Sequence, residues 1–81
     1  MGKFYYTYVL KSDIDNKLYI GWTNNLKNRI RKHNKGLVSA TKSRRPFSLV
    51  YFEACLFKAK AIQREKTLKT GFGRQYLKLR I

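Results

Sequence analysis

The stretch Lys17–His33, KLYIGWTNNLKNRIRKH, constrains the fold of this chain more than any other. It begins with residues that favour a β-strand and reaches Gly21, after which the polar side chains of Thr23 and Asn24 can cap the free N–H groups of a new helix. We therefore expect a strand, a tight turn and a helix of residues 24–35 in immediate succession.

The helix expected after this turn has one apolar face with two polar groups at its border. Leu26 and Ile30 are four residues apart, and His33 follows three residues later, so all three share that face. Arg29 lies at its edge, and Gly36 is expected to end the helix. An imidazole and a guanidinium are therefore brought to the rim of the core.

The rest of the chain alternates segments that favour strands with segments that favour helices. Strands are expected at 4–11, 17–22 and 47–55, and helices at 24–35, 57–69 and 72–80. The first strand is apolar on both faces, which predicts a central strand or one covered on both sides. The order ββαβαα predicts an α/β (α+β) fold, a small three-stranded antiparallel sheet flanked by helices, in a single domain of residues 1–81.

The two helices near the C-terminus are oriented by their apolar residues. The inward-facing positions are expected to be Phe57, Ala61 and Leu68 in the first helix and Phe72, Tyr76 and Leu79 in the second. Gly71 is interpreted as the stop between the two helices.

Glu65 falls on the inward stripe of the first of these helices, four residues after Ala61 and three before Leu68. A carboxylate that faces a core is costly unless it is paired or binds a cation. Helical spacing leaves two interpretations open: a structural salt bridge with Arg29 or Arg64, or a single carboxylate ligand for a hard divalent ion such as Mg²⁺.

The charge balance indicates a polyanionic partner. The 81 residues include 19 Lys and Arg against 4 Asp and Glu, a net charge of +15, which favours nucleic acid first and an acidic membrane second. No apolar run approaches the roughly 20 residues of a membrane span, and no signal peptide is visible. Cys55 has no partner for an internal disulfide and is expected to be a small core residue, which fits a reducing cytoplasm.

The polar segment 36–46 carries Lys42, Arg44 and Arg45 and is a candidate for binding phosphates, with a solvated connection as the alternative. One His and one Cys cannot build a zinc site of ordinary spacing, and the chain has no Gly-rich nucleotide-binding loop. The candidate chemistry is therefore confined to Tyr, Arg, His and Glu side chains.

Several stretches of the chain match, in order, the motifs of a known family. Tyr19-Ile20-Gly21 is a complete YIG motif, and Tyr6-Thr7-Tyr8 matches the preceding GIY motif at its tyrosine. Downstream, TNNLKNRIRKH carries an arginine on the following helix, and RRPFSLVYFE and AIQREKTLK complete the pattern. Over nearly its whole length the chain resembles the GIY-YIG nuclease family, in particular small stand-alone members similar to the nuclease domain of a DNA-repair excinuclease.

This resemblance implies a metal-dependent phosphodiester hydrolase. The tyrosine matching Tyr8 activates the attacking water, and the one matching Tyr19 assists by hydrogen bonding. The arginine matching Arg29 stabilises the charge that develops on the phosphate, and His33 matches a position that helps proton transfer. The glutamate matching Glu65 holds one divalent ion, Mg²⁺ or Mn²⁺.

The chain departs from the family pattern in two places. The first motif lacks its Gly and Ile, which are backbone and packing positions. Many members carry an asparagine after the acidic helix that helps place the substrate, whereas this chain has no asparagine beyond Asn34. Gln75 is the nearest chemical substitute and is taken as a candidate substrate-binding residue.

Two functions from different classes remain in view. The first is an endonuclease acting on DNA, branched, nicked or single-stranded, with weak or structure-directed specificity. The alternative is a non-catalytic module that binds DNA or RNA, because phosphate contacts alone drive sequence-independent binding. A third idea is a catalytic component that a protein partner targets. Glu65 separates the first two, since a mere binder gains nothing from an inward carboxylate that repels phosphate without a metal.

Overall fold

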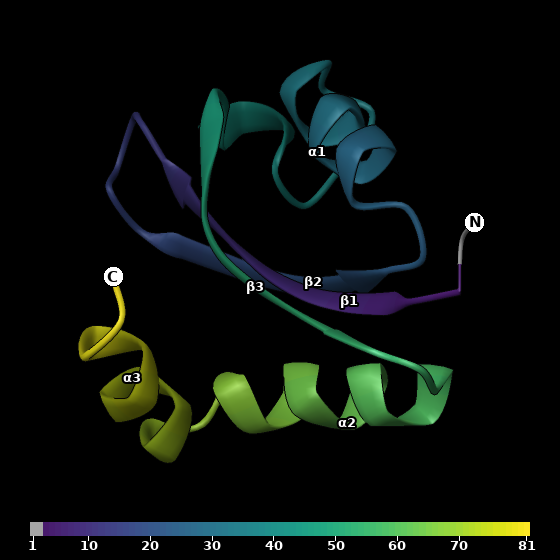
Figure 1. The fold of residues 1–81 in the computed structure, drawn as a ribbon. Coiled ribbons are helices and arrows are strands. Elements are labelled where there is room, and N and C mark those ends of the chain that lie inside the picture. Colours follow the sequence, from purple (N-terminus) through teal and green to yellow (C-terminus); the bar gives the residue numbers. More distant parts are fainter. Residues whose placement is uncertain (1–2) are drawn as a thin grey trace.

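The chain folds into a three-stranded sheet with three α-helices (Figure 1). The computed structural model describes residues 3–81. In chain order the elements are β1 (Tyr5–Ser12), β2 (Leu18–Thr23), α1 (Leu26–Asn34), the 3₁₀ turn η1 (Lys42–Arg44), β3 (Phe47–Cys55), α2 (Lys58–Leu68) and α3 (Gly71–Lys78). The predicted order ββαβαα and the α+β class are confirmed. Among the residues described, no helix is long and apolar enough to cross a membrane.

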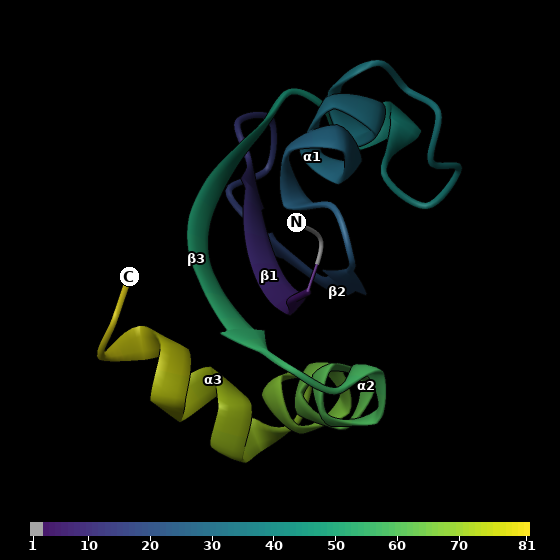
Figure 2. The ribbon, with the colours of Figure 1, turned by 45° about the vertical axis from the view of Figure 1, so that its right-hand side comes forward.

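The central strand of the sheet is β1. The strand order is β2-β1-β3, and both neighbours run antiparallel to β1. The helix α1 lies over one face of the sheet, and α2 and α3 lie over the other, as both views show (Figure 1 and Figure 2). Both faces of β1 are thus covered, which explains why its sequence is apolar on both sides.

Successive side chains of β1 enter two separate cores. Tyr8 packs beneath α1 together with Leu10 and Phe47. Val9 points the other way and packs against Leu68 of α2 and Leu77 of α3. Burying one aliphatic or aromatic side chain contributes roughly 1.5–3 kcal/mol. Tyr8 differs from the others because its phenol carries a hydroxyl into the core, where it needs a hydrogen-bond partner.

The start of α1 differs from the prediction, and its end agrees. Asn25 is the N-cap, and its side-chain oxygen accepts from the Asn28 N–H at 3.1 Å. The prediction of Thr23 or Asn24 as the cap is therefore wrong; Thr23 accepts from the Asn25 N–H at 3.1 Å and tightens the turn. Gly36 has φ +76°, a left-handed conformation that glycine adopts at low cost, so it ends the helix as predicted.

The apolar faces predicted for α2 and α3 are only partly correct. Ala61 and Leu68 are buried as expected. Phe57, Phe72 and Leu79 are instead 66%, 64% and 85% exposed. Periodicity places residues on a helix face, but it does not say how the helix ends sit against the sheet.

Close contact between α2 and α3 decides which residues of α3 are buried. A Cβ atom at Gly73 would collide with the backbone of Leu68, so the two helices meet backbone to backbone at this point. Gly73 and Leu77 become the buried residues of α3. Gly71 begins α3 and does not end α2, which corrects its predicted role.

Candidate active site

The site is organised by the passage of Tyr8 across the neighbouring strand. Tyr8 of β1 pairs with Gly21 of β2, and its ring lies directly over that glycine. A Cβ atom at Gly21 would stand 2.5 Å from the Tyr8 hydroxyl oxygen, so no other residue leaves room for the ring. The glycine of the YIG motif therefore lets a buried phenol extend from the central strand over the edge strand β2.

The helix α1 brings two polar groups to this hydroxyl. His33 Nε2 lies 2.8 Å from the Tyr8 oxygen, and Arg29 Nε donates to the same oxygen at 3.3 Å. Tyr8 and His33 are 1% and 0% exposed, whereas Arg29 is half-buried. Arg29 and His33 are four residues apart, so one turn of α1 presents both side chains to the same atom.

Burial sets the protonation states of this pair. Burial raises the pKa of the Tyr8 hydroxyl, and the neighbouring Arg29 guanidinium offsets part of that rise. Burial also lowers the pKa of His33 to about 4, and the positive charge of Arg29 acts in the same direction. At neutral pH the site therefore holds a neutral phenol against a neutral imidazole, beside a permanent cation.

Two further side chains complete the surroundings of His33. The Tyr19 ring lies edge-on to the His33 ring, with 5.0 Å between their centroids. Thr41, from the segment that links α1 to β3, places its hydroxyl oxygen 2.8 Å from His33 Nδ1. Sequence reasoning missed Thr41, because the basic residues dominate this segment and no motif marks a lone threonine. Only the return of the chain after Gly36 brings it to the imidazole.

Glu65 lies on α2, across the sheet from α1, and it pairs with Lys69. Its Oε2 accepts from Lys69 Nζ at 2.8 Å, and its side chain is 18% exposed. The predicted structural salt bridge with Arg29 or Arg64 is therefore wrong. The Glu65 charge is nonetheless close enough to Tyr8 to contribute to the raised pKa of that hydroxyl.

The donors around Glu65 fit a hard divalent ion better than zinc. Within residues 3–81 no three His, Cys, Asp or Glu side chains gather into a metal-binding group. A single carboxylate is compatible with Mg²⁺ or Mn²⁺, which proteins commonly hold with one or two carboxylates, water and substrate phosphate. Binding of such an ion by Glu65 would require Lys69 to release the carboxylate. The Lys69 side chain is flexible and 53% exposed, so it can move away.

The candidate phosphate-binding residues of segment 36–46 lie in different surroundings. Arg44 donates to the Asp15 carboxylate at 2.9 Å and to the Lys17 carbonyl at 3.1 Å, which ties this segment to the β1–β2 turn. That carboxylate has its pKa lowered to about 2 by Arg44. Arg45 packs over Gly36 at the end of α1, and Lys42 is exposed in η1.

The structure does not bring Gln75 to the Tyr8 cluster. Gln75 is exposed on α3, on the other face of the sheet. It lines a hollow of about 780 Å³ together with Lys11, Val50 and Ile81. A role in placing a substrate against Tyr8 would require a nucleic acid that reaches around the sheet.

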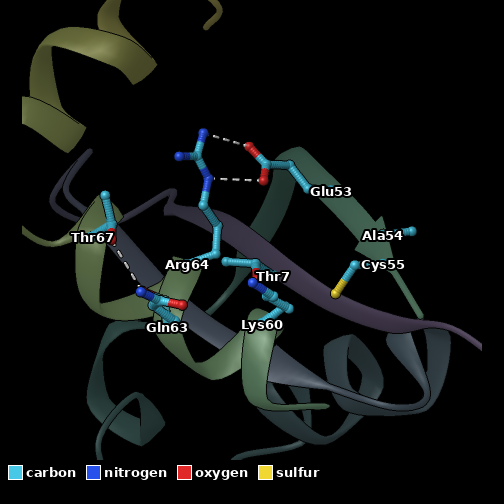
Figure 3. A pocket seen from close by; sticks show the side chains of 8 residues that line it. All are labelled: Thr7, Glu53, Ala54, Cys55, Lys60, Gln63, Arg64 and Thr67. Carbon is cyan, nitrogen blue, oxygen red and sulfur yellow. Dashed lines mark hydrogen bonds and ion pairs between the residues drawn. The ribbon is translucent and has the colours of Figure 1, made fainter. Parts of the chain in front are cut away.

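A second polar cluster occupies the α2 face (Figure 3). Arg64 of α2 donates two hydrogen bonds, of 2.9 and 3.0 Å, to the Glu53 carboxylate of β3. The pair borders a hollow of about 340 Å³ that Thr7 and Cys55 also line. Cys55 is half-buried at its wall, with Sγ donating to the Phe57 carbonyl, so its predicted place in the core is wrong.

Comparison with known proteins places the chain in a family. Residues 4–78 match the sequence model described as the GIY-YIG catalytic domain. The chain therefore belongs to the GIY-YIG family, and the resemblance indicated by its motifs is confirmed.

Its relatives include small proteins of similar length. A UPF0213 protein of Staphylococcus haemolyticus is 43% identical over 76 residues, which cover 93% of this chain and 92% of that protein. A UPF0213 protein of Clostridium perfringens is 45% identical over 75 residues, covering 91% of this chain and 80% of the relative. The solution NMR structure of a UPF0213 protein from Bacillus halodurans superposes with a TM-score of 0.56 at 31% identity, covering 91% of this chain and 81% of that one.

Proposed function

We propose that this chain is a metal-dependent endonuclease that hydrolyses phosphodiester bonds in DNA, with weak or structure-directed specificity. The observation that carries the proposal is the contact of the buried Tyr8 hydroxyl with His33 Nε2 at 2.8 Å and Arg29 Nε at 3.3 Å. A phenol between a neutral base and a permanent cation suits proton transfer beside a phosphate. Membership of the GIY-YIG family and the net charge of +15 support the same chemistry.

Tyr8 acts as the proton acceptor for the attacking water. Because its pKa is raised, the hydroxyl is protonated at neutral pH and cannot act as a preformed tyrosinate. Tyr8 therefore passes its own proton to His33 Nε2 while its oxygen takes one from water. The negative charge of a bound phosphodiester offsets the positive charge of Arg29. This raises the pKa of His33, which is therefore more basic at the moment of attack.

Arg29 and Tyr19 act on the phosphate and on the imidazole. Arg29 uses Nε for the Tyr8 oxygen, which leaves the other N–H donors of its guanidinium for phosphate oxygens as charge develops. Tyr19 lies against the edge of the His33 ring and is half-buried, so its hydroxyl is available to assist by hydrogen bonding.

Glu65 would hold the divalent ion, and the exposed side chains of Lys42 and Arg45 would contact the nucleic acid backbone. When bound, the ion supplies charge stabilisation for the leaving oxygen. Contacts of this kind go to phosphates and not to base edges, which is consistent with weak sequence specificity.

The test is nicking of supercoiled plasmid and of a branched DNA with Mg²⁺ or Mn²⁺, with binding measured in parallel. We expect Tyr8→Phe to lose about 10²–10⁴-fold in cleavage rate, because a general base is removed. Arg29→Ala is expected to lose about 10²–10³-fold, and Glu65→Gln to lose its response to the metal. All three variants should still bind DNA.

Matched controls separate the chemistry from charge and from fold. Arg31→Ala removes the same charge from the exposed side of α1, and Tyr76→Phe removes a hydroxyl from the other face of the sheet. Both should cleave DNA within a few-fold of wild type. If the wild-type protein binds DNA with no cleavage in either metal on any substrate, the non-catalytic binding module replaces this proposal.

A further inference from the structure

Thr41 makes a contact that its position in the chain does not require. It is the N-cap of the 3₁₀ turn η1, where a threonine hydroxyl ordinarily accepts from a free backbone N–H of the turn. Its side chain makes no such bond here. Instead the fully buried hydroxyl lies 2.8 Å from His33 Nδ1 and 3.4 Å from the Val38 carbonyl oxygen.

The partners of this hydroxyl fix the direction of the hydrogen bonds. The Val38 carbonyl can only accept, so Thr41 donates its single hydroxyl hydrogen there. The Thr41 oxygen then accepts from His33 Nδ1–H. With the proton on Nδ1, His33 Nε2 carries a lone pair, and the Tyr8 hydroxyl donates to it.

The opposite tautomer satisfies fewer groups. A proton on His33 Nε2 would point at the Tyr8 oxygen, which already accepts from Arg29 Nε. The Tyr8 hydroxyl hydrogen would then have no acceptor among the contacts in the described residues, and Thr41 would turn from Val38 toward Nδ1. The first arrangement makes one more hydrogen bond, and in a site this buried an unmade bond is costly.

We propose that Thr41 is a positioning residue that holds His33 as the Nδ1–H tautomer, so that Nε2 is free to take the Tyr8 proton. The inference rests on the proposed nuclease function for its catalytic consequence but not for the tautomer itself. A merely structural role would make Thr41 a small polar filler beneath the loop, exchangeable for a residue of the same shape.

The tautomer can be read directly by NMR. His33 is the only histidine in the chain, so one set of imidazole ¹⁵N shifts, observed through long-range ¹H–¹⁵N correlations at pH 7, reports it alone. We expect the Nδ1–H form in the wild type and in Thr41→Ser, which keeps the hydroxyl. In Thr41→Val, which keeps the shape, the Nε2–H form should predominate at least tenfold.

The catalytic consequence is measured on the same variants. Thr41→Ser should cleave DNA within about threefold of wild type, and Thr41→Val at least tenfold more slowly with its KM nearly unchanged. The wild type in the Nε2–H form, or Thr41→Val folded with the tautomer unchanged, would overturn the inference. If Thr41→Val fails to fold, the His33 tautomer measured in the wild type and in Thr41→Ala tests the inference instead. The NMR result stands even if no DNA is cleaved, so failure of the nuclease proposal remains distinguishable.

Discussion

The two faces of the sheet hold polar networks made from similar residues and put to different uses. Under α1, the Tyr8 hydroxyl meets the neutral base His33, and no carboxylate in the described residues touches this network. Under α2, the Tyr51 hydroxyl donates to Glu53, which Arg64 also holds. In the first network the Tyr8 hydroxyl faces a neutral base that can accept its proton. In the second, the Tyr51 hydroxyl donates to a carboxylate that an arginine already holds.

The difference lies in what faces each phenol. Burial raises the pKa of both Tyr8 and Tyr51, but the hydrogen bond to the Glu53 carboxylate raises that of Tyr51 further, while Arg29 opposes the rise at Tyr8. On the α2 side, the Tyr76 ring also contacts two guanidiniums, those of Arg64 at 4.6 Å and Arg80 at 3.6 Å from its centroid. A carboxylate network with stacked cations therefore joins α2, α3 and β3. The Tyr8 network has no carboxylate among its hydrogen-bond partners, and Glu65 acts on it only through its charge.

The Gly21→Ala substitution tests whether the position of Tyr8 sets the difference between the two faces. The added methyl group would stand 2.5 Å from the Tyr8 hydroxyl and displace the ring from His33, with no change to the α2 network. We expect cleavage to fall at least tenfold, because a displacement of about 1 Å can cost roughly 10²-fold in rate.

The control is Gly71→Ala, which adds the same methyl group where no atom lies within 4 Å apart from its chain neighbours and the backbone of its own helix. It should leave cleavage unchanged. Equal losses in Gly21→Ala and Gly71→Ala would show that a general loosening, and not the position of Tyr8, governs the rate.

The second network is tested by Glu53→Gln. The carboxylate is partly buried, and one of its two guanidinium bonds would meet an amide N–H₂ group in place of an oxygen. We expect a loss of about 1–2 kcal/mol in the free energy of unfolding, measured with urea, and cleavage within twofold of wild type. Asp13→Asn, at an exposed acid in the β1–β2 turn, should change neither quantity. A large loss of cleavage at full stability would mean that the two networks are not separate.

Acid should weaken the two networks in sequence. The folded pKa of His33 is about 4 against an ordinary 6.5, so the unfolded chain binds the proton more readily and stability falls as the pH drops below 6.5. Between pH 7 and 5.5 the free energy of unfolding should fall by about 1 kcal/mol from this group. Tyr8, Tyr19 and Arg29 face the imidazole. Burial raises the pKa of the Tyr8 hydroxyl, so Tyr8 stays protonated throughout that range.

The Glu53 network should respond at lower pH. Burial alone would raise the pKa of this carboxyl, but the bonds from Arg64 and Tyr51 outweigh burial and hold it below its ordinary 4.5. Its contribution is therefore complete above pH 4.5 and is lost below it.

The acid sensitivity assigned to His33 is checked by urea unfolding of His33→Gln. Its free energy of unfolding should not change between pH 7 and 5.5; a pH dependence equal to that of the wild type would place the acid sensitivity elsewhere.

Local sequence was a good guide to the elements and to part of the site. Alternation made β1 apolar on both faces and so indicated a central strand. Helical spacing placed Arg29 and His33 on one side of α1, and the YIG motif marked Gly21. These features depend on neighbours one to four residues away, which a sequence displays directly.

Contacts across the chain were decided by the tertiary structure alone. The partner of Glu65 was missed although Lys69 lies four residues further on, the spacing of an ion pair along a helix. The partner of Arg64, by contrast, was decided by packing, which brings Glu53 of β3 against α2. The hydroxyl of Thr41 reaches the imidazole through a loop that periodicity does not describe. Side-chain period fixes which face a residue occupies, but the partner on that face is set by how separate elements pack, a property no local pattern contains.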